Sequence, residues 1–83
     1  MEHIGHFDDE IKWRKDFGSN LQRLLHIKKI TQTEFATKLG VTDATLSNYI
    51  NGVHIPNGYK IRQMANILGC DINRLYYVDS MFE

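Results

Sequence analysis

A stretch near the middle of the chain carries side chains suited to specific hydrogen bonding. Asp43, Thr45, Ser47 and Asn48 are short and polar, and Ala44 among them is small. Serine and asparagine are poorer helix formers than alanine or glutamate, so helix stability alone does not explain them in a short helical segment. Hydroxyl and amide groups both donate and accept hydrogen bonds, whereas a carboxylate only accepts them. These residue types therefore favour recognition of a polar partner.

No group of residues indicates catalysis or metal binding. His3 and His6 could share a metal, but the single cysteine, Cys70, completes no zinc-ligand spacing with them. The contiguous acids at 8–10 are not arranged as a catalytic pair is usually held, and no glycine-rich phosphate loop occurs. We therefore expect no enzyme activity, no catalytic residue, no cofactor and no bound metal.

Composition indicates one small domain. The chain has 83 residues and one cysteine, which allows no internal disulfide and is typical of a reducing compartment, so we expect a cytoplasmic protein. No apolar run approaches the roughly 20 residues that a membrane span needs, so we expect no membrane association. The net charge of zero conceals an asymmetry: residues 17–69 carry +4, and residues 1–16 and 70–83 each carry −2. A basic middle section is compatible with a polyanionic partner.

The spacing of apolar residues predicts helices throughout, because no segment alternates with the period of a strand. Phe17, Leu21 and Leu25 mark one face of a first helix, which could start earlier with a cap at Asp8 or Asp9.

Capping signals predict where the other helices begin and end. The second helix is expected to start at Thr31, with Glu34 three residues later, and to end at Gly40. The third is expected to start at Thr42 and to end at Asn51-Gly52. Asn57 or Gly58 begins the fourth, which ends at Gly69, and Asp71 caps a short fifth. The sequence thus predicts a compact all-α domain of five helices.

The second and third helices, joined by a short turn that begins at glycine, are typical of a helix-turn-helix. Ala36 must be small where the two helices cross, and Gly40 must accept a positive φ. Val41 and Leu46 must fill the crossing, and Tyr49 must pack back onto the core.

The chain resembles the Cro and lambdoid-repressor type of helix-turn-helix domain, which includes xenobiotic-response-element-like regulators. The matching segments are ITQTEFATKLGVTDATLSNYING, a proline four residues past that last glycine, and YKIRQMANILGCDINRLY. The resemblance spans residues 17–76 and implies a five-helix lambda-repressor-like fold. It also implies a transcriptional repressor of bacterial or phage type that binds double-stranded DNA as a homodimer. We expect an N-terminal extension at 1–15, which could lengthen the first helix, a DNA-binding domain at 16–77 with its helix-turn-helix at about 32–51, and a tail at 78–83.

In such a domain the third helix, about residues 43–51, enters the major groove. Base readout is expected from Asp43, Ala44, Thr45, Ser47 and Asn48. Asn48 could pair bidentately with adenine, and Ala44 or the Thr45 methyl could contact a thymine methyl. Contacts to the DNA backbone are expected from Gln32, Lys28, Lys29, Lys38, Asn51 and His54.

One departure from the family concerns phosphate contacts. Val53 and His54 stand where members often carry lysine or arginine. Fewer phosphate contacts imply a shallower salt dependence, by about 0.9 in log–log slope for each contact. A protonated His54 would restore one contact at lower pH, a hypothesis that equal affinity at pH 6 and pH 8 would refute.

Alternatives remain open at this stage. Asp43 could simply complement the positive end of its helix, and Asn51 could simply end that helix. The whole protein could instead be an antitoxin or another protein-interaction module, in which Met81 and Phe82 dock a protein partner, with weak or no DNA binding.

Overall fold

A computed structural model describes the backbone of residues 2–76 and the side chains of residues 10–72, 74 and 75. The elements are α1 (Glu2–Lys28), α2 (Gln32–Leu39), α3 (Asp43–Ile50), α4 (Gly58–Leu68) and α5 (Asn73–Tyr76). Residues 2–76 contain no strand, so the all-α prediction is confirmed. Four of the helices have eight residues or more, but α5 is a single turn of four residues. The predicted count of five helices is therefore not confirmed.

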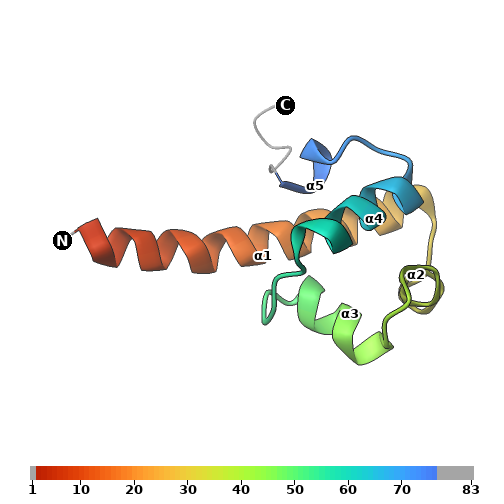
Figure 1. The fold of residues 1–83 in the computed structure, drawn as a ribbon, viewed down its shortest axis with the longest axis horizontal. Coiled ribbons are helices and arrows are strands. Elements are labelled where there is room, and N and C mark those ends of the chain that lie inside the picture. Colours follow the sequence, from red (N-terminus) through yellow and green to blue (C-terminus); the bar gives the residue numbers. More distant parts are fainter. Residues whose placement is uncertain (1, 77–83) are drawn as a thin grey trace.

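Helix α1 is much longer than the apolar pattern from Phe17 onward predicts. It runs without interruption from Glu2, so neither Asp8 nor Asp9 caps its start. Figure 1 shows its N-terminal turns projecting beyond the other helices. The helix ends where Lys29 adopts a positive φ of 59° and the Ile30 amide donates to the Leu25 carbonyl at 2.9 Å.

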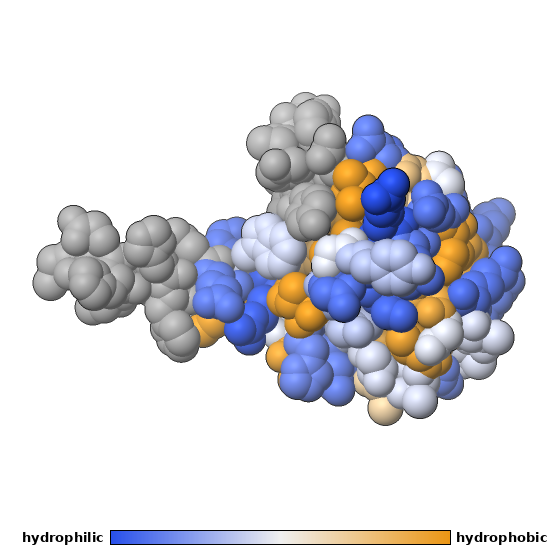
Figure 2. All heavy atoms as spheres, in the orientation of Figure 1, coloured by the Kyte–Doolittle hydropathy of each residue, from blue (hydrophilic) through white to orange (hydrophobic). Residues whose placement is uncertain are grey.

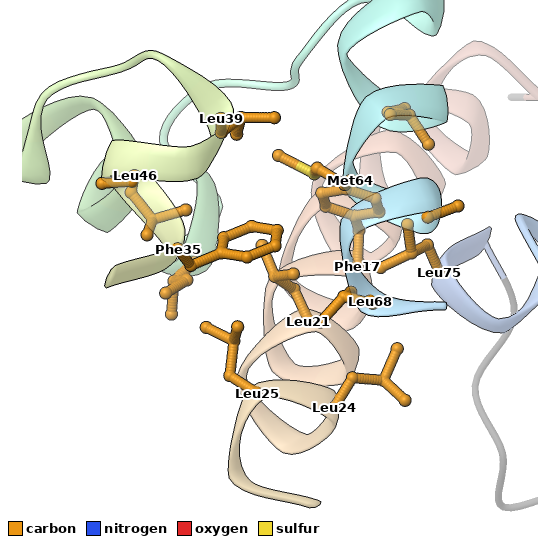
Figure 3. Close-up of a cluster of buried hydrophobic side chains, with 14 residues drawn as sticks. Phe17, Leu21, Leu24, Leu25, Phe35, Leu39, Leu46, Met64, Leu68 and Leu75 are labelled. Atoms are coloured by element: carbon orange, nitrogen blue, oxygen red, sulfur yellow. The ribbon is translucent and has the colours of Figure 1, made fainter. Parts of the chain in front are cut away.

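The hydrophobic core joins all five elements (Figure 3). Each element contributes at least one side chain that is fully buried, for example Leu21, Phe35, Leu46, Met64 and Leu75 in chain order. Burying a side chain of this size contributes roughly 1.5–3 kcal/mol. The short helices are therefore held by packing on α1 and α4, because helices of eight residues or fewer are marginal in water.

The predicted N-caps of α2, α3 and α4 are confirmed. Thr31 Oγ1 accepts a hydrogen bond from the Glu34 amide, and Thr42 Oγ1 accepts one from the Thr45 amide, each at 3.1 Å. Asn57 caps α4 through its Oδ1, which accepts from the Lys60 amide at 2.8 Å. Each cap pairs one of the backbone N–H groups that a helix start leaves without an intrahelical partner.

The predicted glycine ends of α2 and α4 are also confirmed. Gly40 and Gly69 are the C-caps of these helices and have φ angles of 81° and 67°. Residues other than glycine adopt these left-handed backbone angles only at a cost in free energy.

A buried asparagine, which sequence reasoning did not identify, ties α5 to α1. Asn20 is 4% exposed, and its Nδ2 donates to the backbone carbonyl of Arg74. Arg23 Nη2 in turn donates to Asn20 Oδ1 at 2.8 Å. The predicted tail from residue 78 onward, with Met81 and Phe82, lies outside the described residues. None of the described helices has the length and apolar character needed to cross a membrane.

Candidate nucleic-acid interface

The turn between α2 and α3 is shaped by three residues. Ala36 is 1% exposed, and its carbonyl accepts from the amides of Gly40 at 2.9 Å and Val41 at 3.0 Å. The left-handed Gly40 redirects the chain, and Val41 packs partly buried against the core. The predicted positive φ of Gly40 is therefore confirmed, and the burial of Ala36 and Val41 agrees with their predicted places at the helix crossing.

Helix α3 is fixed to the body along its inner face. Leu46 is fully buried, Ile50 is 8% exposed, and Tyr49 packs partly buried against the core, as the sequence predicts. At the C-terminal end of the helix, Gly18 of α1 lies so close that an added Cβ would overlap the Ile50 carbonyl oxygen. The orientation of α3 thus depends on a glycine in another helix.

The loop after α3 also packs on α1. A Cβ added at Gly52 would lie 3.1–3.3 Å from atoms of Lys15, and the amides of Val53 and His54 donate to the Asn48 carbonyl at 2.9 and 3.3 Å. Sequence reasoning missed the role of Gly18, although a glycine inside a helical pattern is a signal of close packing.

The five predicted base-reading residues lie on the face of α3 away from the core. Figure 1 shows α3 at the edge of the body, with its N-terminal end directed away from α1. Asp43 and Ala44 are exposed, and Thr45, Ser47 and Asn48 are partly exposed. The structure therefore gathers these residues on one outward surface of a short helix.

Two of these side chains already have hydrogen-bond partners within the protein. Asp43 Oδ2 accepts from Thr33 Oγ1 of α2 at 3.2 Å, and Thr42 Oγ1 donates to Thr45 Oγ1 at 2.9 Å. Among the residues that the structure describes, Ser47 and Asn48 have no side-chain hydrogen bond. Their donors and acceptors are available to a partner, whereas Asp43 also links α2 to α3.

The predicted backbone-contacting residues are all exposed and lie on both sides of α3. The set comprises Gln32 and Lys38 on α2, Lys28 and Lys29 at the end of α1, and Asn51 and His54 after α3. In Figure 1 the end of α1 and helix α2 lie at one end of the body, and the loop after α3 lies toward the other. Cationic and amide groups therefore lie toward both ends of the body, and the structure does not join them in one cluster.

In the part of the chain that the structure describes, the remaining polar groups do not indicate a catalytic or metal-binding site. Among the described side chains, no three histidine, cysteine or acidic residues come together as a metal site requires; His3 and His6 lie outside these side chains. Partial burial raises the pKa of the Cys70 thiol above its ordinary value, although the nearby Arg74 and Lys28 act against that effect. Cys70 packs against the core, as a small apolar residue would.

Comparisons with known proteins agree with this geometry. The fold is similar to the solution structure of the SOS-response transcriptional repressor LexA from Eubacterium rectale, with a TM-score of 0.77 and 24% sequence identity. The similarity covers 84% of this chain and 74% of that one, and at this identity it concerns the fold alone. No curated protein matches the chain significantly. Residues 21–75 match the helix-turn-helix family, and the chain therefore belongs to the Cro- and repressor-type helix-turn-helix family of DNA-binding regulators.

Proposed function

We propose that this protein is a transcriptional repressor of bacterial or phage type that binds double-stranded DNA sequence-specifically as a homodimer. The observation that carries the proposal is the outward face of α3, where short polar side chains are presented on a helix anchored from behind. In this proposal α3 enters the major groove, and residues 16–77 act as a lambda-repressor-like DNA-binding domain of five helices. The residues before and after it form an extension and a tail. A DNA target and a lone cysteine both favour a cytoplasmic location.

Base recognition would come mainly from the hydrogen-bonding groups that the protein leaves available. Asn48 can present its amide to the N6 and N7 atoms of adenine, and Ser47 can donate or accept. Ala44 and the Thr45 methyl suit a thymine methyl group. Asp43 can accept from cytosine N4, although its bond from Thr33 also favours a role in holding α2 against α3.

Contacts to the DNA backbone would orient the helix without reading sequence. Gln32 is the first residue of α2, where free backbone N–H groups also favour a phosphate. Lys28, Lys29 and Lys38 would contact phosphates on one side of α3, and Asn51 and His54 would do so on the other. Cationic side chains attract the polyanion over distances of about 8–10 Å at ordinary salt.

Selection of duplexes from a random pool tests this function. The enriched duplex is titrated against a scrambled duplex of equal length at two salt concentrations. We expect an enriched inverted repeat and a specificity ratio of at least about 10³. Failure to enrich any sequence, or equal binding to the enriched and the scrambled duplex, would refute sequence-specific recognition and direct the search to a protein partner.

A matched pair of variants tests the role of Asn48. Asn48→Ala should weaken binding to the selected duplex by about 1–3 kcal/mol and relax the preference at one base pair. Asn66→Ala changes an exposed asparagine on α4 and should leave both affinity and preference unchanged. If the two variants bind alike, Asn48 does not read a base.

A further inference from the structure

The projecting part of α1 continues the face on which α3 packs. Within the body this face includes Gly18, which meets Ile50, and the buried Leu21 and Leu25. Their spacing of three and four residues keeps one side of a helix in register. Ile11 lies seven residues before Gly18 and so on the same side of the helix, with Arg14 between them, and it is 38% exposed.

The sequence extends this apolar register beyond Ile11. Positions 7 and 4 hold Phe7 and Ile4, again at spacings of four and three residues. Because residues 2–28 form one continuous helix, these positions share the face that carries Ile11. A helix of roughly ten residues is only marginally stable in water, so a projecting apolar face gains from packing on another surface.

Exposed apolar side chains of the α3–α4 loop lie across a hollow from the sequence neighbours of Ile11 in α1. Val53 is 52% exposed and Ile55 is 37% exposed. The loop borders a hollow whose other wall is formed by Glu10, Trp13 and Arg14 of α1. Figure 2 shows small hydrophobic areas among hydrophilic residues at this end of the body. We call Ile11, Val53 and Ile55 the α1–loop patch.

The charges around Ile11 indicate which partner covers this patch. Three acids at positions 8–10 precede Ile11, and bases follow it at 12, 14 and 15. Asp8 and Lys15 are seven residues apart and therefore lie on the same edge of the apolar face. Two such helices packed in parallel would place like charges together, whereas an antiparallel pair centred near Ile11 would place acids opposite bases. Because a two-fold axis at this point relates the two copies, each favourable acid–base pair occurs twice in the dimer.

We propose that the α1–loop patch binds the same patch of a second copy of this chain, with the two α1 helices antiparallel about Ile11. In this dimer the Asp8 position of each copy faces Lys15 of the other. The inference rests on the proposed dimeric DNA binding and names the surface through which the dimer forms. The loop that packs against α1 would join this contact directly to the C-terminal end of α3.

Cysteine cross-linking of the full chain tests the position of the axis. In a Cys70→Ser background, Ile11→Cys should form a disulfide-linked dimer with oxidised glutathione as electron acceptor, because a residue near the axis comes within roughly 4–7 Å of its copy. Ile27→Cys is the control, since Ile27 is more exposed, at 55%, and lies at the other end of α1. Equal cross-linking of both variants, or none at Ile11→Cys, would overturn the proposal.

Charge exchange tests the antiparallel register. Asp8→Lys and Lys15→Asp should each weaken self-association by roughly two- to thirtyfold, since two exposed pairs are lost in each case. An equal mixture of the two variants should associate again, because each variant now complements the other. Sedimentation velocity measures association, and circular dichroism checks that the helix content is unchanged. A mixture that associates no better than either variant alone would contradict the register.

DNA binding by a further variant, Ile11→Ser, separates this inference from the proposed function. A duplex with a single half-site should bind Ile11→Ser as well as it binds the unchanged protein, while cooperative binding to the full inverted repeat should be lost. Undiminished cooperativity in Ile11→Ser would reject this dimer surface but leave the DNA-binding function intact. If the unchanged protein binds neither the half-site nor the full inverted repeat better than scrambled DNA, the proposed function is rejected instead.

Discussion

Gly18 of α1 lies directly against the Ile50 carbonyl at the C-terminal end of α3. A Cβ at this glycine would lie 2.6 Å from the Ile50 carbonyl carbon and 2.9 Å from the Tyr49 carbonyl oxygen. Both neighbours are backbone atoms, so no side chain can turn aside to make room. This contact sets the distance between the first helix and the one that we propose enters DNA.

Gly18→Ala should therefore destabilise the protein, although the same change inside a helix usually stabilises it by up to about 1 kcal/mol. Overpacking against backbone should lower the free energy of unfolding by roughly 1–3 kcal/mol. Gly58→Ala is the matched control, because Gly58 also lies in a helix but has open space around its Cα. Urea denaturation of both variants measures the effect. Equal or raised stability of Gly18→Ala would show that α3 can shift without loss.

The N-cap of α2 provides a second prediction. Thr31→Ala removes the hydroxyl that accepts from the Glu34 amide and should lower the free energy of unfolding by about 1 kcal/mol. Thr37→Ala removes an exposed hydroxyl that bonds only to the Thr33 carbonyl one turn earlier, and it should stay within about 0.5 kcal/mol. Thermal unfolding of the two variants compares them directly. A cost at Thr37 as large as that at Thr31 would argue against a specific capping effect.

The salt dependence of DNA affinity tests the proposed contacts to the phosphate backbone of DNA. If Lys38 neutralises a phosphate, Lys38→Ala should reduce the slope of log affinity against log salt by about 0.9 and weaken binding to all sequences alike. Arg62→Ala removes an exposed cation from α4 and should change the salt slope and the affinity less than Lys38→Ala does. Titrations at four salt concentrations with the selected duplex give both slopes. An unchanged slope for Lys38→Ala would place this lysine outside the interface.

Cys70 gives a prediction for alkaline pH. Burial raises the pKa of this thiol in the folded protein, so the folded state holds the proton more tightly than the unfolded state does. The resulting stability is fully present below the unfolded pKa and is lost as the pH rises through the folded pKa. We expect iodoacetamide to modify Cys70 more slowly in the folded chain than in urea at the same mildly alkaline pH. Equal rates would show that the thiol is not shielded.

Local signals in the sequence predicted the helix boundaries well. The caps at Thr31, Thr42 and Asn57 and the left-handed glycines at 40 and 69 act within one turn of the chain, so their residue types are sufficient evidence. Helical periodicity likewise predicted that Asp43, Ala44, Thr45, Ser47 and Asn48 lie on the side of α3 away from the buried Leu46. Their contacts with DNA remain a prediction.

Contacts between distant segments were not predicted. Asn20 bonds to a carbonyl 54 residues later, and Thr33 bonds to Asp43 across the turn. Sequence spacing gives the face on which each residue lies but does not identify the partner that packs there. The extension of α1 back to Glu2 was also underestimated. The first part of this helix projects beyond the body, so its residues do not show the regular spacing of buried core residues that would have predicted a helix there.

The anchoring of α3 affects how the sequence of such a protein can evolve. The inward residues Leu46, Tyr49 and Ile50 and the loop amides on the Asn48 carbonyl hold the helix without help from its outward side chains. Substitutions at Ala44, Ser47 and Asn48 would therefore leave the folded state nearly unaltered. If α3 reads DNA as proposed, single substitutions at these positions change the target preference while the folded scaffold is retained.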